Sequence, residues 1–346
     1  MNSVKADNGA SLLEVEDLAV EFDTYGGIVQ AVRGVSFSVE KGKTLAIVGE
    51  SGCGKSVTVQ SMMGLIPMPP GRITSGSAKL KGQEILGRTV VNGKEIRGSE
   101  IGMIFQDPMT SLNPTMTIGD QIAEPLQVHR GYSYKKAFNE AIRLLEMSKI
   151  PEAAKRARQY PFEFSGGMLQ RAMIAMAIAC KPSILIADEP TTGLDVTIQA
   201  QILDLLQDLQ RETGMAVILI THDLGVVARM ADEVAVMYAG KIVEHGMVDD
   251  VFYRSAHPYT LGLKEAMPTN DPSLQHELKP IEGSPPDLFS PPQGCGYCAR
   301  CPYAMQICNK RQPDDTFLAE HHFSRCWLHH VSSPNKPDQL YFKEEA

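Results

Sequence analysis

The chain has 346 residues, of which 43% are hydrophobic and 21% charged, a composition typical of a folded globular protein. Lysine and arginine total 33 against 41 acidic residues, and this net charge of −8 argues against nucleic acid as a partner. No apolar run approaches the roughly 18 to 20 residues of a membrane-spanning helix, and Met1 to Ala10 has no apolar signal core, so we expect a cytoplasmic chain that contacts a membrane only through partner proteins.

The first part of the chain predicts antiparallel strands followed by a strand, a loop and a helix. Residues 12–39 alternate apolar and polar positions in pieces, with turn signals at Gly26-Gly27 and Arg33-Gly34. Residues 44–48 form a continuous apolar run, and residues 56–65 have the pattern of a helix. Between them stands a glycine-rich loop: Gly49-Glu50-Ser51-Gly52-Cys53-Gly54-Lys55-Ser56.

This loop has the spacing of a phosphate-binding loop. Its glycines allow successive backbone N–H groups to turn inward around phosphates at a helix N-terminus. We expect all eight loop residues and Val57 to contact ATP phosphates, with Lys55 neutralising the β- and γ-phosphates and Ser56 binding Mg²⁺. The alternative is a chance glycine-rich turn, which the strand before the loop and the helix after it disfavour.

A helical segment and a second glycine pair occupy the middle of the chain. Between about residues 121 and 159, apolar residues recur at spacings of three and four. Ser165-Gly166-Gly167 then precedes the apolar helical run 172–180. We expect these glycines to expose backbone donors at another helix N-terminus, a second phosphate-binding end. The alternative is that they only form a turn.

Two acidic residues follow a short buried strand. Residues 184–187 and 216–220 predict strands separated by a helix, which implies a parallel α/β sheet. Asp188-Glu189 follows the first strand, at the carboxyl end where open α/β sheets bind ligands. We expect Asp188 to accept Mg²⁺, directly or through another ligand, and Glu189 to polarise the attacking water as general base. A solvated acidic strand end is the alternative.

Six motifs stand in a distinctive order, and this order resembles the nucleotide-binding subunit of ATP-binding cassette (ABC) transporters from about Leu12 to His257. The motifs are the phosphate loop, Phe105-Gln106-Asp107-Pro108, Phe164-Ser165-Gly166-Gly167, Asp188-Glu189-Pro190, Gly193-Leu194-Asp195 and Thr221-His222-Asp223. The resemblance implies a P-loop NTPase of the α/β class, with a RecA-like core, an antiparallel β subdomain and a helical subdomain. Phe164 and Met168 depart from the commonest signature, and neither change removes its serine or glycines.

The resemblance also implies a head-to-tail dimer, in which Ser165, Gly166 and Gly167 close over the nucleotide of the partner. By the same resemblance, Gln106 is expected to link Mg²⁺ or a water molecule to the membrane subunits. His222 resembles the γ-phosphate switch and Asp195 the aspartate at the dimer contact. The alternative for each of these is a local cap or a polar loop residue.

A stacking aromatic for adenine is also implied by the resemblance. Tyr25 lies where the family places it, although Phe22 is close enough in sequence to compete. We favour Tyr25.

The end of the chain resembles the ATPases of oligopeptide and dipeptide importers. After a proline-rich segment come Gly294-Cys295, Arg300-Cys301-Pro302, Cys308 and Cys326, and His257-Pro258-Tyr259-Thr260 precedes it. The four subfamily positions, Cys295, Cys301, Cys308 and Cys326, have the thiolates that a [4Fe–4S] cluster needs. Four-cysteine zinc, with Cys298 as an extra candidate, and a metal-free reduced tail are the alternatives.

These observations predict a domain order and a role. We expect an ATPase domain over 11–266 with its helical subdomain at about 110–180, a linker over 267–293, a cysteine module over 294–330 and a polar tail over 331–346. The resemblance implies ATP hydrolysis that powers di- or oligopeptide import from the cytoplasmic face of the membrane. It further implies a second, different ATPase subunit, two transmembrane permeases and an extracytoplasmic solute-binding protein.

Three rival functions remain open from the sequence. One is an ATPase for import of nickel or another small solute, which uses a closely similar engine. Another is a soluble ABC-type ATPase outside transport, although the chain has one cassette and no coiled-coil heptads. The third, an exporter subunit, is disfavoured by the cysteine tail and by the absence of a fused membrane domain.

Overall fold

The computed structural model describes residues 11–343 except 88–89, 92–93, 268–278 and 335. Three predicted segments lie wholly or partly outside the described residues. They are Met1 to Ala10, most of the first half of the predicted linker, and the last three residues of the predicted tail. None of the helices that are described is both long and apolar enough to cross a bilayer.

The centre of the molecule is a mixed sheet, in the strand order β13-β14-β12-β11-β3-β10-β9-β8. From β11 to β8 all neighbours are parallel, and β12 joins antiparallel to β11. The three central strands are buried at every position, as expected for a parallel sheet covered on both faces. Their bounds are β3 Thr44–Val48, β8 Ile101–Ile104, β9 Ile184–Asp188, β10 Ala216–Thr221, β11 Glu233–Tyr238 and β12 Lys241–Met247.

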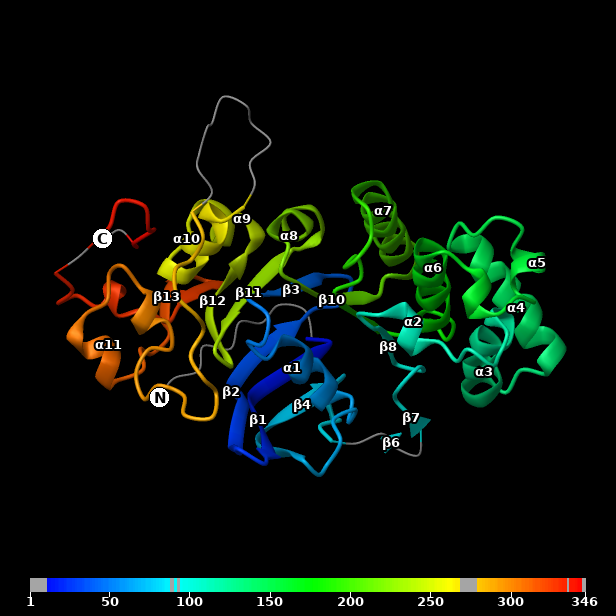
Figure 1. The fold of residues 1–346 in the computed structure, drawn as a ribbon, viewed down its shortest axis with the longest axis horizontal. Coiled ribbons are helices and arrows are strands. Elements are labelled where there is room, and N and C mark those ends of the chain that lie inside the picture. The colour runs from blue at the N-terminus through cyan, green and yellow to red at the C-terminus, as the bar shows by residue number, and fades with distance from the viewer. Residues whose placement is uncertain (1–10, 88–89, 92–93, 268–278, 335, 344–346) are drawn as a thin grey trace.

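A second, antiparallel sheet has the order β2-β1-β4-β5 and lies below the first in Figure 1. It comprises β1 Leu13–Thr24, β2 Gly27–Val39, β4 Gly71–Leu80 and β5 Gln83–Glu84, and the small pair β6 Val90–Val91 and β7 Lys94–Glu95 follows. The expected turn at Gly26-Gly27 is present. The expected turn at Arg33-Gly34 is wrong: both residues lie inside β2, where the pairing with β1 shifts register and Gly34 has a φ of 83°. A glycine at a bulge gives the same local signal as a glycine in a turn.

Helices gather at one end of the molecule, on the right of Figure 1. They are α2 Pro108–Ser111, α3 Ile118–Arg130, α4 Tyr134–Met147, α5 Ala153–Arg156 and α6 Gly166–Ala177. Apolar residues of α3, α4 and α6 share one buried cluster with α7 and one face of the central sheet. The helices near the sheet are α1 Lys55–Met62, α7 Val196–Thr213, α8 Leu224–Met230, α9 Val248–Tyr253 and α10 Pro258–Glu265.

The C-terminal cysteine module extends the central sheet, a feature that the sequence did not indicate. Its elements are α11 Gln306–Lys310, β13 Thr316–Ala319 and β14 His322–Ser324. Strand β14 pairs with β12, so the module adds two strands to the edge of the sheet. The fully buried carboxylate of Glu244 in β12 accepts hydrogen bonds from the backbone N–H of Ala256 (2.7 Å) and His257 (2.9 Å), and lies 2.9 Å from His322 Nε2 of β14.

Candidate nucleotide-binding site

The glycine-rich loop connects β3 to α1, as the sequence predicts, and two of its glycines are required by the space around them. A Cβ at Gly49 would overlap the carbonyl oxygen of Met237, and one at Gly54 would overlap that of Ala31. Gly54 also has a φ of 103° as the residue that caps α1, a conformation that side chains other than glycine rarely adopt. The loop is therefore fitted closely against the neighbouring strands.

Lys55 bonds to the main chain of the loop, and Ser56 bonds to Asp188. Lys55 is buried, and its Nζ donates to the carbonyl oxygens of Gly49 (2.8 Å) and Glu50 (3.0 Å). Ser56 Oγ donates to Asp188 Oδ1 at 3.0 Å. The hydroxyl and the carboxylate thus form a pair of oxygen donors beside the loop, which is the ligand type that Mg²⁺ prefers. These two residues fit a Mg²⁺ ion.

Three residues predicted from separate motifs meet at the next position along the sheet edge. Gln106 Nε2 donates to Glu189 Oε2 at 2.9 Å, and His222 Nδ1 lies 3.2 Å from Glu189 Oε1. They follow the neighbouring strands β8, β9 and β10, whose parallel order brings their carboxyl ends to one edge. Thr192 Oγ1 also donates to Glu189 Oε2 at 2.9 Å, a contact that no sequence motif indicated.

The pKa values of the two neighbouring carboxyl groups, Asp188 and Glu189, are shifted in opposite directions. Burial raises the pKa of Asp188, and this outweighs the hydrogen bond from Ser56. Burial also acts to raise the pKa of Glu189, but hydrogen bonds from His222 and Thr192 and the charges of His222 and Lys55 together lower it. Glu189 is therefore an ionised carboxylate at neutral pH, the form that accepts a proton.

The predicted stacking residue is open to solvent. Tyr25, at the turn between β1 and β2, is fully exposed, whereas Phe22 is half-buried and packs against the core under the antiparallel sheet. Of the two aromatics, Tyr25 is the one with a free ring face.

The predicted signature forms the N-terminus of α6. Ser165 precedes the helix in an extended conformation, is exposed, and its side chain makes no capping hydrogen bond. A Cβ at Gly167 would lie 3.0 Å from Ile198 Cγ2, so the signature lies against the start of α7. Asp195 caps α7 by accepting a hydrogen bond from the N–H of Ile198 at 3.0 Å. A local cap was the alternative to a dimer contact for this residue.

The cysteines of the C-terminal module gather but do not form a metal site as they stand. No group of three or more His, Cys, Asp or Glu among the described residues is arranged to hold a metal ion, so the predicted iron–sulfur or zinc site is not confirmed. The backbone N–H of Cys295 donates to the carbonyl of Cys308 at 2.7 Å. Burial, and after it the nearby thiols of Cys308 and Cys298, raise the pKa of Cys295 to about 11.

Two contacts to the phosphate loop were missed from the sequence. Glu50 of the loop is bound by Arg300 and Tyr259, both from segments quoted above only for their resemblance to the importer ATPases. They lie 250 and 209 residues away along the chain, and no local pattern indicates such pairing.

Comparison with known proteins agrees with this geometry. A family described as "ABC transporter" matches residues 32–192, and one described as "Oligopeptide/dipeptide transporter, C-terminal region" matches residues 243–308. The dipeptide transport ATP-binding protein DppD of Bacillus subtilis is 55% identical over 92% of this chain and 94% of its own length. The oligopeptide transport ATP-binding protein OppD of Salmonella typhimurium is 53% identical over 88% of this chain and 90% of its own.

Solved structures agree in fold. The ATP-binding cassette MJ0796, described as a dimer in a post-hydrolysis state bound to ADP and Pi, is 25% identical with a TM-score of 0.59, covering 68% of this chain and 98% of that one. DppD and OppD are more than 50% identical to this chain and cover about nine tenths of it. The protein therefore belongs to the ABC ATPase family, in the branch of the oligopeptide and dipeptide transport ATP-binding proteins.

Proposed function

We propose that this chain binds and hydrolyses ATP to drive a membrane importer of dipeptides or oligopeptides. The observation that carries the proposal is the contact of Glu189 with both Gln106 and His222, next to the pair formed by Ser56 and Asp188. The peptide as cargo is supported by the names of relatives that match about nine tenths of the chain, 92% for DppD and 88% for OppD.

We assign each residue at the sheet edge a role in ATP hydrolysis. The loop N–H groups and Lys55 bind the β- and γ-phosphates, and Ser56 and Asp188 would hold a Mg²⁺ ion, which would neutralise charge on the phosphates. Glu189 accepts a proton from the water whose oxygen attacks the γ-phosphorus while the bond to the β–γ bridging oxygen breaks. Gln106 and His222 hold Glu189 and orient that water, and Tyr25 stacks on adenine.

The exposed signature supports a shared site. Ser165, Gly166 and Gly167 present a helix N-terminus to solvent, where it is free to meet the γ-phosphate of a nucleotide bound by another subunit. We therefore place a second ATPase subunit head-to-tail against this surface, with Asp195 at the contact. In this importer branch we favour a second, homologous gene product over a homodimer.

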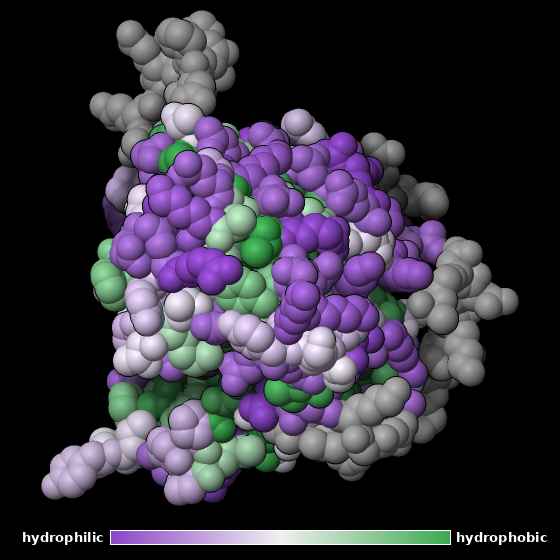
Figure 2. All heavy atoms as spheres, turned by 90° about the vertical axis from the view of Figure 1, so that its right-hand side faces the viewer, coloured by the Kyte–Doolittle hydropathy of each residue, from purple (hydrophilic) through white to green (hydrophobic). Residues whose placement is uncertain are grey.

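The helical end of the molecule offers a surface for the two permease subunits. Figure 2 looks onto this end, where hydrophilic side chains cover most of the surface and hydrophobic ones emerge between them. Tyr160 and Phe162 form a stacked pair with ring centroids 5.7 Å apart, and Phe162 is 73% exposed. We take this exposed aromatic pair as the candidate contact to the permeases. Docking there places the chain on the cytoplasmic face of the membrane.

Uptake assays test the cargo. Cells that lack this chain are expected to lose uptake of a labelled tripeptide and to keep uptake of labelled nickel ion, because in the proposed shared sites the second ATPase subunit cannot close over a nucleotide without this chain. Wild-type chain supplied in trans is expected to restore uptake. Loss of nickel uptake with normal tripeptide uptake would identify the small-solute importer, and normal uptake of both would favour an ATPase outside transport.

We also propose a [4Fe–4S] cluster on Cys295, Cys301, Cys308 and Cys326, with zinc as the alternative. The proposal is supported by the presence of these four cysteines, with Cys298 as a fifth, in one short module, and the described arrangement is not itself a metal site. Its expected role is structural. Protein purified without oxygen is expected to contain iron and acid-labile sulfide at about four each per chain. Zinc without iron would identify the alternative, and absence of both would leave a metal-free module.

A further inference from the structure

Glu50, the second residue of the phosphate loop, is bound by a side chain from the C-terminal cysteine module. Arg300 donates from one terminal nitrogen to Glu50 Oε2 at 2.6 Å and from the other to Oε1 at 3.0 Å. This is the two-pronged geometry in which an arginine holds a carboxylate most firmly. The Arg300 side chain is only 4% exposed and that of Glu50 28%, so the pair is partly shielded from solvent.

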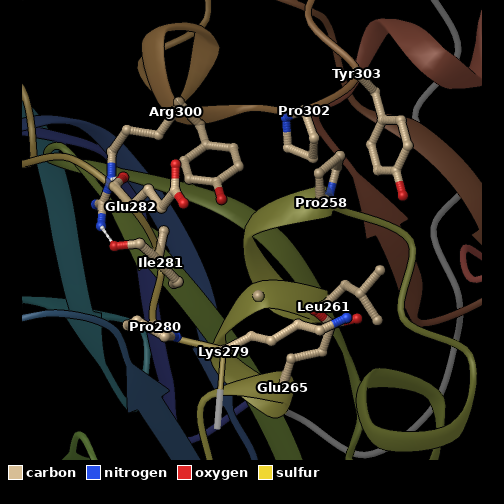
Figure 3. A pocket seen from close by; sticks show the side chains of 12 residues that line it. Pro258, Leu261, Glu265, Lys279, Pro280, Ile281, Glu282, Arg300, Pro302 and Tyr303 are labelled. Carbon is tan, nitrogen blue, oxygen red and sulfur yellow. Dashed lines mark hydrogen bonds between the residues drawn. The ribbon is translucent and has the colours of Figure 1, made fainter. Parts of the chain in front are cut away.

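The guanidinium of Arg300 is itself fixed from several sides. It donates to the carbonyl oxygens of Ile281 (3.0 Å) and Glu282 (2.9 Å) and to the hydroxyl of Tyr238 (3.2 Å). Figure 3 shows Arg300 turned toward Ile281 and Glu282 at one side of a pocket of about 480 Å³. With all these acceptors in place, the guanidinium has one position, and it holds Glu50 in one position.

The main chain of Glu50 is fixed as well. Its N–H donates to the Tyr259 hydroxyl at 2.9 Å, and its carbonyl accepts from Lys55 Nζ at 3.0 Å. Tyr259 belongs to a buried aromatic cluster with Tyr238 and Tyr297, whose ring centroids lie 4.5 to 5.3 Å apart. Glu50, whose carbonyl accepts from Lys55, is thus held by its side chain and by its backbone.

We propose that Arg300 is a positioning residue for ATP: through Glu50 it fixes the phosphate loop in its nucleotide-binding form, so that the cysteine module contributes to ATP affinity. Loop N–H groups bind phosphate well only when they are aimed before the ligand arrives. Lys55 must also leave the carbonyls of Gly49 and Glu50 to reach phosphate, and this exchange is easiest when the loop itself stays in place. Arg300 touches no reacting atom and acts only through Glu50.

The test compares full-length variants by their affinity for a fluorescent ATP analogue and by KM and kcat in the assembled transporter. Arg300→Met is expected to weaken binding and raise KM by at least about tenfold, with kcat at saturating ATP near wild type because Glu189, His222 and Gln106 are untouched. Arg300→Lys keeps the charge without the two-pronged bond and is expected to recover part of the affinity. Glu50→Gln is expected to weaken binding in the same direction.

The double variant Glu50→Gln/Arg300→Met decides whether Arg300 acts through Glu50. If it does, the double variant binds no more weakly than Arg300→Met alone, because the second change removes a contact already lost. Multiplied losses, or wild-type affinity in Arg300→Met, would overturn the proposal. If Arg300→Met does not fold, wild-type affinity in Glu50→Gln overturns it equally, since that change leaves the module intact.

The matched control is Arg325→Met in the same module. Arg325 pairs with Asp315, also in the module, so its loss tests general disturbance of the module without touching Glu50. Its ATP affinity is expected to equal wild type, and a loss as large as that of Arg300→Met would assign the effect to module stability instead. The inference rests on ATP binding at the phosphate loop; failure of that function would appear as a wild-type chain that does not bind the analogue.

Discussion

Glu189→Gln is expected to lower ATP hydrolysis by the assembled transporter by at least about 100-fold, the usual contribution of a general base. The glutamine amide has the size of the carboxylate and can still accept from Gln106 and Thr192, but it cannot take a proton from water. ATP binding is expected to stay close to wild type, because Lys55, Ser56 and Asp188 are unchanged. Phosphate release and nucleotide affinity, measured on the same preparation, separate the two effects.

The same variant tests the shared site. Since bound ATP is not consumed, the closed pair of ATPase subunits is expected to persist and to be recovered together on a sizing column. Glu140→Gln is the matched control, because Glu140 pairs with Arg143 on α4 and takes no part in the sheet edge. Hydrolysis by Glu189→Gln as fast as by Glu140→Gln would contradict the role of Glu189.

Lys55→Met is expected to weaken ATP binding by at least about 100-fold, because charge-assisted bonds to the β- and γ-phosphates are lost. Methionine fills similar space along the buried stem, so the fold is expected to stay intact, with the unfolding temperature near wild type. Titration with a fluorescent ATP analogue measures the loss.

Lys43→Met is the control for Lys55→Met. Lys43 lies just before β3, at the opposite end of this strand, and makes an exposed ion pair with Asp232. Surface pairs of this kind contribute little to stability, and no effect on ATP affinity is expected. Equal losses in the two variants would indicate a general charge effect and not a phosphate contact at Lys55.

Most of the nucleotide site was predictable because its residues follow strands. Lys55 follows β3, Glu189 follows β9 and His222 follows β10, and each of these strands is a short apolar run that the sequence predicts, whereas Gln106 follows β8, which was not predicted as a strand. Parallel order brings such strand ends to a common edge. Glu189 therefore contacts Gln106 and His222 because all three residues follow strands whose carboxyl ends meet at the same edge of the sheet.

The remaining features depend on contacts between distant segments. The sequence around Gly34 predicts a turn, but in the structure Gly34 lies at a bulge where β2 pairs with β1. Strand β14 is only three residues long, so its pairing with β12 leaves no periodic signal. Arg300 stands among cysteines and prolines, and its partner Glu50 is a loop residue for which the glycine and lysine spacing of the loop requires no particular side chain. Charge complementarity alone does not select one glutamate among many.

The pairing of β14 with β12 has a practical consequence for dissecting the chain. Shortening it to the cassette alone, before residue 294, would uncover the backbone donors and acceptors of β12 that β14 now occupies. It would also leave the buried Glu244 carboxylate without His322. An uncovered strand edge recruits other chains. We therefore expect the minimal ATPase unit that stays dispersed in solution to include the whole cysteine module, with Cys326, and to end after residue 330.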